Sequence, residues 1–463
     1  MNSHLVTPQP LFASRRMLGN FVVLVLCSQF AFAVLAMKGA LLPQMLELWQ
    51  ISKTQFGLLM SIYGIVHNIF YVALAWAQDR FSARVLIPVN MVLGGCTTFW
   101  LGTTTDFVWL CFLFGMLSLW CEGAFWPAVL SAVRKTTSDR NQGKIFGLLE
   151  GGRGAIELLQ NVITVSLYTA LGYSLFGLEL AFKVNAVIMV LLGVAAWFVL
   201  PGGTLLKAGA DRQKANREVL QGMNVTLRLP EVWLAGCVGF TIYLAYTALP
   251  FFLTYLKDLY VLPALAIAVF GIASTSGGRI GMALPAGFIA NRWCGGATGG
   301  MRIGLALVVL TAGGMTLLPV SATMTGLAIV LMTVMALLFF FLRALYFAPF
   351  GEMGLPQRFS GSVMAVAAFL IYLPSSFAYL LWGWLLDTYP GVTGYQLMFA
   401  TIGLVAVAGV ALAHKLQRNL DQGTASRIAD AIARLDDRLH LSGGELTLER
   451  LIERRRGQSP NRR

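Results

Sequence analysis

Charged side chains are scarce in this chain of 463 residues. Asp, Glu, Lys and Arg together make up 12% of the sequence, and 57% of the residues are hydrophobic. Soluble domains carry roughly a quarter charged residues. The composition therefore excludes an ordinary soluble protein and predicts an integral membrane protein.

Residues of metal, redox and nucleotide chemistry are few as well. The six cysteines form no CxxC pair, the four histidines are scattered, and neither an H-E-x-x-H nor a G-x-x-x-x-G-K-[ST] motif is present. These absences argue against a disulfide framework, a zinc or haem site and an ATP-driven pump. We expect no cofactor, no metal and no enzymatic activity. Any transport then has to be driven by a gradient of an ion or a solute.

Long apolar runs are what the sequence has in abundance. Twelve runs approach about 20 residues, the length that crosses a bilayer as a helix. They fall into two sets of six on either side of a polar interval. The runs begin near Leu18, Gln55, Val85, Phe107, Ile145, Leu178, Val232, Ala264, Ile303, Thr325, Ser362 and Val392.

This pattern predicts an all-α membrane protein with twelve transmembrane helices in two pseudo-symmetric six-helix bundles. The expected parts are an N-terminal tail at 1–17, bundles at 18–200 and 231–414, a central loop at 201–230 and a C-terminal tail at 415–463. Apolar residues at helical spacing in 426–441 predict an amphipathic helix in that tail. We expect residues 426–463 to touch the membrane surface or to bind a cytoplasmic partner.

The basic residues indicate the orientation. The formal net charge is +13, and the basic residues gather in the tails, the central loop and the other connections on one side. The opposite side carries only Lys53, Lys183 and Lys257. By the positive-inside rule both termini are cytoplasmic, which suits a multi-pass protein of a bacterial inner membrane. The charge thus reports topology, and we expect no nucleic-acid partner.

The two halves share a short motif. A shift of 212 positions lays residues 75–81 over residues 287–293, each at the end of the second helix of its half. These residues resemble motif A of the major facilitator superfamily, G-x-x-x-D-R-x-G-R-R. Asp79, Arg80 and Arg84 match the motif in the first copy, while in the second copy Arg292 matches and Asn291 replaces the acid.

The resemblance implies a secondary transporter whose two halves rock about a central site. It also implies that Asp79, Arg80, Arg84, Asn291 and Arg292 form a cytoplasmic gate. Residues 79–88 are further similar to the corresponding loop of organophosphate:phosphate antiporters. That likeness implies a phosphate ester as one substrate class, although the first helix offers Lys38 near the place where those antiporters have an arginine.

Ionisable residues inside the predicted helices are the main functional signal. Left facing lipid, they would together cost on the order of 20 kcal/mol, so they must face the interior or one another. They are Lys38, Glu122, Glu150, Arg153, Glu157, Arg279 and Arg343.

We predict a substrate site at the middle of the membrane. His67 precedes Asp79 by twelve residues, about 18 Å of helix, and the 212-residue shift places Arg279 at the equivalent depth. The predicted substrate-binding residues are Arg279, Arg343, Arg153, Lys38, His67, Tyr243 and Tyr246. The alternatives are a structural ion pair for Arg279, a hydrogen-bonded neutral side chain for His67 and a snorkelling side chain for Lys38.

The predicted proton-coupling residues are Glu122, Glu150 and Glu157. Glu150, Arg153 and Glu157 lie on one helical stripe, so Arg153 is either neutralised by the two acids or open to competition from substrate or proton. When the fourth and tenth predicted helices are aligned, Glu122 falls close to the position of Arg343. Glu122 then either exchanges a proton or forms a salt bridge with Arg343 or Lys38.

The leading hypothesis is alternating-access transport of a small organic anion, a carboxylate or a phosphorylated solute, with proton coupling or anion exchange. The alternative is proton-coupled efflux of amphipathic cations or drugs, with Glu122, Glu150 or Glu157 as the counter-charge. A third hypothesis is a transport-inactive sensor or scaffold that acts through the C-terminal tail. The efflux hypothesis is favoured over anion transport if all four interior basic residues are ion-paired and an acidic residue remains unpaired.

Overall fold

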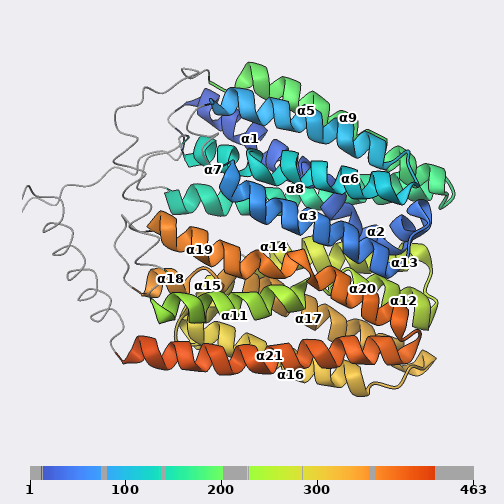
Figure 1. The fold of residues 1–463 in the computed structure, drawn as a ribbon, viewed down its shortest axis with the longest axis vertical. Coiled ribbons are helices and arrows are strands. Elements are labelled where there is room, and N and C mark those ends of the chain that lie inside the picture. The colour runs from blue at the N-terminus through green and yellow to red at the C-terminus, as the bar shows by residue number, and fades with distance from the viewer. Residues whose placement is uncertain are drawn as a thin grey trace, which may run out of the picture.

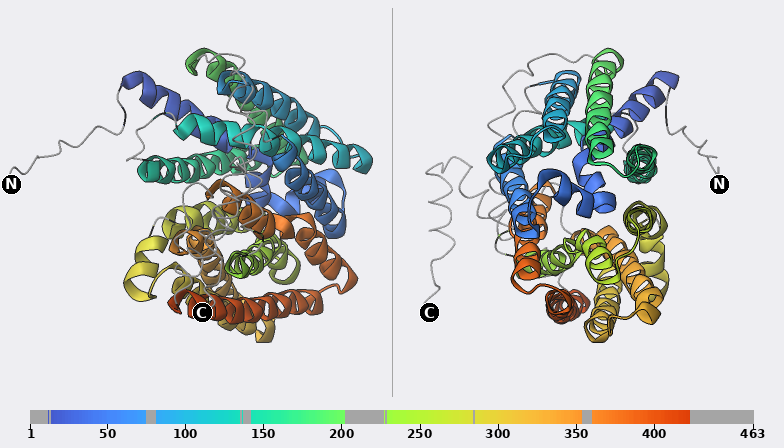
Figure 2. Two further views of the ribbon diagram at one scale, coloured as in Figure 1. Left: turned by 60° about the vertical axis from the view of Figure 1, so that its left-hand side comes forward. Right: turned by 90° about the vertical axis from the view of Figure 1, so that its right-hand side faces the viewer.

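The computed structural model describes residues 12, 14–74, 81–134, 136, 142–201, 227, 229–283, 285–353 and 360–422. Regular structure in these ranges is helical throughout, with no strand. Two bundles of antiparallel helices lie side by side (Figure 1). In the two further views the blue-to-green helices and the lime-to-red helices stay in separate groups (Figure 2).

The first bundle ends at residue 199. Its elements are α1 Arg15–Phe30, α2 Ala33–Trp49, α3 Lys53–Ala73, α5 Ala83–Leu101, α6 Phe107–Ser118, the π-helix η1 Leu119–Gly123, α7 Phe125–Arg134, α8 Gln142–Ala170 and α9 Leu175–Val199.

The second bundle begins at residue 230. Its elements are α11 Pro230–Tyr246, α12 Phe251–Tyr260, α13 Ala264–Ile272, the π-helix η3 Ala273–Gly277, α14 Gly278–Ala283, α15 Ala286–Trp293, α16 Ala297–Leu317, η4 Ala322–Met324, α17 Thr325–Leu345, α18 Pro349–Glu352, α19 Ser360–Tyr372, η6 Leu373–Ser376, α20 Ala378–Thr388 and α21 Val392–Asp421.

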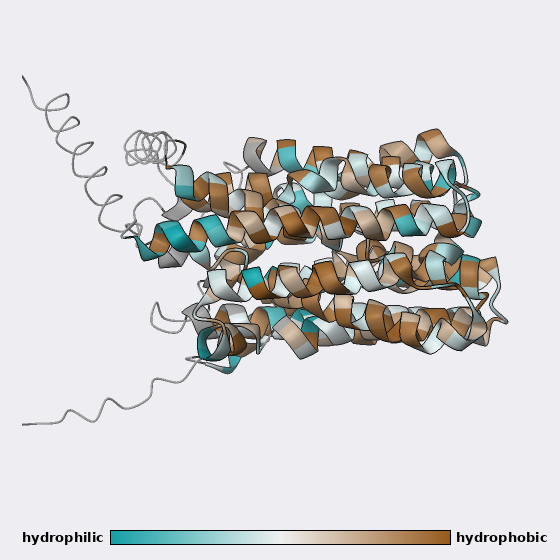
Figure 3. Cartoon of the chain, turned by 90° about the horizontal axis from the view of Figure 1, so that it is seen from below, coloured by the Kyte–Doolittle hydropathy of each residue, from teal (hydrophilic) through white to brown (hydrophobic). Residues whose placement is uncertain are grey.

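The helices have the length and composition of membrane spans. In the described part of the chain, nine helical segments are long and apolar enough to cross a bilayer, and ten if α1 and α2, which meet at 42°, form one span. Hydrophobic residues cover the middle of the helices, while hydrophilic ones gather toward both ends (Figure 3). The all-α, multi-span fold is confirmed, and the count of twelve spans stays a prediction.

The predicted domain boundaries agree with the helix ends only in part. The helix α21 continues past residue 414 to Asp421. Most of the predicted central loop lies outside the described residues, as do the amphipathic helix at 426–441 and nearly all of the N-terminal tail.

Several helices are interrupted part-way along their length. A π-helix contains Glu122, and a second one ends two residues before Arg279. Leu41 leaves helical geometry two residues before Pro43, and Pro374 lies in a short 3-10 turn between α19 and α20. Irregular backbone at membrane depth is tolerated where it is buried in protein or lines a cavity, and π-bulges are frequent at functional sites. The interruptions therefore point to the centre of the molecule.

Glycines allow close packing between the bundles along α3 and α20. A Cβ atom on Gly57 would collide with the backbone of Tyr379, and one on Gly64 would collide with the backbone of Ser375. Nearby, the amide of Asn68 donates a hydrogen bond to the Ser376 hydroxyl across 2.9 Å. Small residues let membrane helices approach closely enough for such contacts.

We predict that Gly64→Val destabilises the protein by about 1–3 kcal/mol, the usual cost of overpacking. The added side chain would force α3 away from the turn after α19. Thermal unfolding of the purified protein in detergent should show a clear drop in melting temperature.

Gly313→Val is the matched control, because a Cβ atom there meets nothing within 4 Å. Equal melting temperatures for the two variants would contradict the close-packing account.

Candidate functional site

An ion-pair network joins the two bundles near the middle of the molecule. Arg279 on α14 donates to Glu157 across 2.7 Å and to Glu150 across 2.8 Å, both on α8. Arg153, also on α8, donates to the other oxygen of Glu150 across 2.9 Å. Glu150 therefore bridges two guanidinium groups, one from each half.

This arrangement corrects the expectation drawn from the helical stripe. Arg279, rather than Arg153, is the guanidinium held between two acids, because Glu157 points to the second bundle. Arg153 instead packs over the ring of Trp126, with its guanidinium carbon 4.5 Å from the centroid. The structural alternative for Arg279 thus fits the observed contacts better than anion binding.

The positive charge of Arg343 lies against aromatic rings and not against carboxylates. Its guanidinium carbon lies 4.1 Å from the ring centroid of Tyr246 and 5.7 Å from that of Tyr243. Its Nε atom is buried without a hydrogen-bond partner. Within the described part of the chain, no carboxylate pairs with Arg343. Tyr243 and Tyr246 therefore both lie against Arg343, and their role in substrate binding stays a prediction.

Lys38 forms no ion pair with a carboxylate among the described residues. Its Nζ atom donates to the Tyr379 hydroxyl across 3.3 Å and lies 5.2 Å above that ring. The residue is only 8% exposed, and both Arg343 and Glu157 are within electrostatic range of it. Because the amine points to a residue of the other bundle and not to the membrane surface, the snorkelling alternative is wrong.

Glu122 forms a separate pair with His67. The His67 Nδ1 atom lies 3.4 Å from one carboxylate oxygen, and the Tyr63 hydroxyl donates to the other across 3.2 Å. The predicted salt bridge from Glu122 to Arg343 or Lys38 is therefore wrong. The His67 ring contacts Tyr372 of the second bundle edge-on, with the centroids 6.0 Å apart.

The cytoplasmic gate predicted from motif A is described only in part. Asp79 and Arg80 lie outside the described residues. Arg84 donates to the Trp197 carbonyl across 2.8 Å, a contact within the first bundle. Asn291 and Arg292 lie exposed at the end of α15. The gate therefore stays a prediction.

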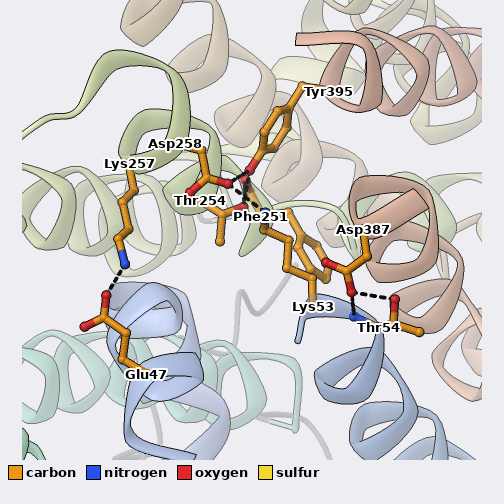
Figure 4. Close-up of polar contacts among 9 residues, drawn as sticks. All are labelled: Glu47, Lys53, Thr54, Phe251, Thr254, Lys257, Asp258, Asp387 and Tyr395. Atoms are coloured by element: carbon orange, nitrogen blue, oxygen red, sulfur yellow. Dashed lines mark hydrogen bonds and ion pairs between the residues drawn. The ribbon is translucent and has the colours of Figure 1, made fainter. Parts of the chain in front are cut away.

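The opposite end of the molecule carries a set of contacts that the sequence analysis missed. Lys53 pairs with Asp258 across 2.7 Å, and Lys257 pairs with Glu47. The backbone amide and hydroxyl of Thr54 both donate to Asp387, across 2.7 Å and 2.6 Å. Each of these contacts crosses between the bundles (Figure 4). We refer to the six residues as the end latch.

The two ion pairs of the end latch line a small cavity of about 220 Å³, together with residues such as Pro43, Gln50 and Thr254. Sequence had placed Lys53 and Lys257 on this side without partners. The remaining lysine of this side, Lys183, pairs with Glu179 one helical turn away. Opposite charges in different halves could have suggested a latch, but only the packing of the bundles decides which ones meet.

The central groups keep accessible surface although the latched end is closed by contacts. The side chain of Glu150 is 50% exposed, and that of Arg279 is 20% exposed. Among the described residues no group of His, Cys, Asp and Glu is arranged to hold a metal ion.

The chain is similar in sequence to a known protein family and to bacterial membrane proteins. The family model described as Major Facilitator Superfamily matches residues 23–378. The inner membrane protein YihN of Escherichia coli K12 is 24% identical over 419 residues, which cover 87% of this chain and 96% of YihN. The inner membrane protein YqcE of the same organism is 25% identical over 381 residues, covering 79% of this chain and 87% of YqcE.

Solved structures are similar in fold. A bacterial homologue of the human lysosomal transporter Spinster, in an inward-facing and unoccupied conformation, superposes with a TM-score of 0.70 at 15% identity, covering 89% of this chain and 98% of that one. The nucleoside transporter NupG superposes with a TM-score of 0.66 at 14% identity, covering 88% and 99%.

We predict that Arg279 and Glu157 are energetically coupled. Removing one partner of a largely buried pair leaves a charge uncompensated, so Arg279→Gln or Glu157→Gln should each destabilise by on the order of 3 kcal/mol. The double variant should cost less than the sum. Thermal unfolding of the four proteins in detergent gives the coupling energy.

The pair formed by Lys183 and Glu179 is the control cycle. It is more exposed and lies on one helix, so its coupling should not exceed about 0.5 kcal/mol. Additive effects at Arg279 and Glu157 would show that the pair does not hold the bundles together.

Proposed function

The chain belongs to the Major Facilitator Superfamily, and we propose that it is a secondary transporter that carries a small organic anion across the bacterial inner membrane by alternating access. The observation behind this assignment is that Arg343 and Lys38, which are within electrostatic range of each other, form no ion pair with a carboxylate among the described residues. A bound anion would compensate both charges.

The energetic argument rests on the cost of burial. A buried charge is stabilised only by pairing and hydrogen bonding. Ring faces and one phenol hydroxyl are weaker partners for Arg343 and Lys38 than the carboxylates that Arg279 has. The protein therefore compensates these two charges only weakly, and a negatively charged solute gains free energy from pairing with them.

The geometry of Arg343 suits an acid group. A guanidinium stacked on an aromatic ring directs its N–H donors along its own plane, away from that ring. Carboxylates and phosphates accept such donors in bidentate fashion, and charge-assisted bonds of this kind are roughly twice as strong as neutral ones. We assign Arg343 and Lys38 to the acid group of the substrate, which is a carboxylate or a phosphorylated solute.

The balance of interior charge favours this assignment over efflux of cations. Lys38, Arg153, Arg279 and Arg343 stand against Glu122, Glu150 and Glu157. Glu150 and Glu157 are bound by arginines, and Glu122 lies beside His67. Among these seven residues, no acid is left over as the counter-charge for a cationic substrate, whereas Lys38 and Arg343 have no carboxylate partner in the described part of the chain.

The end latch and the exposed centre fit one state of an alternating-access cycle. By the positive-inside rule the latched end faces away from the cytoplasm. We therefore assign the structure to an inward-facing state. Arg279 with Glu150 and Glu157 then has a structural role between the halves, and the opposite state requires the end latch to break.

We assign proton coupling to Glu122. It lies beside His67, whose ring contacts Tyr372 of the second bundle. A proton taken up by this pair would change the charge next to the aromatic cluster that surrounds Arg343. The pair is thus placed to link protonation to the occupancy of the anion site.

We predict that Arg343→Ala and Lys38→Ala each reduce anion uptake by roughly 10- to 100-fold, because each removes a charge-assisted hydrogen bond of about 1.5–3 kcal/mol. The measurement is uptake of labelled carboxylates and phosphorylated solutes by proteoliposomes. Arg302→Ala is the control, since Arg302 lies beside His414 at the periphery of the second bundle. Wild-type uptake by both site variants would refute the assignment.

For the coupling role we predict a split phenotype. Glu122→Gln should abolish accumulation driven by a pH gradient, because the side chain no longer ionises, while exchange of internal for external anion continues. Both activities can be measured in the same vesicles. Glu179→Gln, which removes a carboxylate near the latched end, should leave both activities intact. If Glu122→Gln still accumulates anion in response to a pH gradient, the proton acts elsewhere.

A further inference from the structure

Five tyrosines surround the two unpaired cations, all of them from the second bundle. They are Tyr243, Tyr246, Tyr346, Tyr372 and Tyr379. Four of the rings form a connected group: Tyr243 lies 5.1 Å from Tyr372 and 5.7 Å from Tyr246, and Tyr372 lies 6.4 Å from Tyr346, measured between centroids. Such a density of phenol groups around one arginine calls for a physical reason.

The ring faces alone do not explain the hydroxyl groups. Arg343 is also packed against Phe340, at 5.9 Å from its ring centroid, so phenylalanine can supply the same kind of surface. A phenol differs from it by one O–H group, which is costly to bury without a partner. Buried tyrosine hydroxyls normally find hydrogen-bond partners.

The protein itself fills only part of this hydrogen-bonding capacity. The hydroxyls of Tyr346 and Tyr372 lie 3.1 Å apart, and only one of the two can donate to the other. The Tyr379 hydroxyl accepts from Lys38 and keeps its own proton to donate. Within the described residues, Tyr243 and Tyr246 make no hydrogen bond through their hydroxyls.

We propose that the transported anion is a hydroxylated acid whose acid group binds Arg343 and Lys38 and whose hydroxyl groups bind the tyrosine cluster. This inference rests on the proposed function and specifies the body of the substrate. A sugar hydroxyl both donates and accepts, as a phenol does. It can therefore satisfy an unused phenol donor and return a hydrogen bond to a neighbouring oxygen.

Two other kinds of substrate fit the cluster less well. An anion with a hydrocarbon body would displace water from the phenols and leave their hydroxyls unpaired. A neutral polyol would satisfy the phenols but leave Arg343 and Lys38 without negative charge. A site built to bind hydroxyl groups rejects analogues that lack them far more strongly than an apolar site rejects analogues that carry them.

The test uses pairs of anions that differ only in their hydroxyl groups. They are glycerate against propionate, gluconate against hexanoate, and glycerol 3-phosphate against propyl phosphate, with glycerol as the neutral probe. Binding to the purified full-length protein is followed by the shift in its melting temperature and by competition in proteoliposome uptake. The carboxylate and phosphate pairs also distinguish the two kinds of acid group.

We expect at least one hydroxylated anion to bind at least tenfold more tightly than its deoxy partner, and glycerol not to bind. The double variant Tyr346→Phe/Tyr372→Phe should lose most of this preference while it still binds the deoxy partner. Tyr168→Phe is the control, because Tyr168 lies at the end of α8 and packs against Tyr173.

The contrary outcomes are distinguishable. Equal binding within every pair would overturn the hydroxyl assignment and leave anion transport standing. Binding of glycerol as tight as that of glycerate would overturn the anion assignment, and with it the proposal of a hydroxylated anion. The wild-type comparison decides between these outcomes even if the double variant does not fold.

Discussion

The arrangement of the core follows from one constraint: a charge inside a membrane protein must be compensated by other groups of the protein or by a ligand. This chain meets the requirement in two ways. Arg279 and Arg153 receive carboxylates, and the pairs of Arg279 tie α8 to α14. Arg343 and Lys38 receive aromatic faces and a single phenol hydroxyl. The first solution is complete within the protein, while the second leaves hydrogen-bonding capacity for a ligand.

Because their charges are compensated in different ways, Arg279 and Arg343 have different roles. Arg279 has both terminal nitrogens of its guanidinium engaged by acids of the other half, so a solute would have to displace an existing ion pair in order to bind there. A solute at Arg343 displaces no carboxylate. Because the free energy of binding is the gain over what the protein already provides, the poorly compensated arginine is the better binding group.

The sequence predicted the positions of the helices well, but it did not predict which charged side chains pair with each other. Hydropathy located the helices, since burial in lipid demands long apolar runs, and the cost of buried charge identified Glu122 and Arg343 as interior residues. Pairing depends on how two bundles rotate against each other, which no local spacing records. The stripe of Glu150, Arg153 and Glu157 implied contacts within one helix, yet Glu157 reaches Arg279 of the other bundle.

The end latch missed by the sequence analysis has the opposite energetic character from the central network. Lys257 and Glu47 are 40% and 51% exposed, and exposed ion pairs contribute about 0–1 kcal/mol each. A contact of that strength can close one end of the molecule and still open within the energy that binding of a solute supplies. In the central network Glu150 is also half exposed, but Arg279 and Glu157 are only 20% and 12% exposed, so that pair is more costly to separate. Weak pairs at the rim with a stronger network at the centre would let the halves rock about the middle without coming apart, which is the mechanical condition for alternating access.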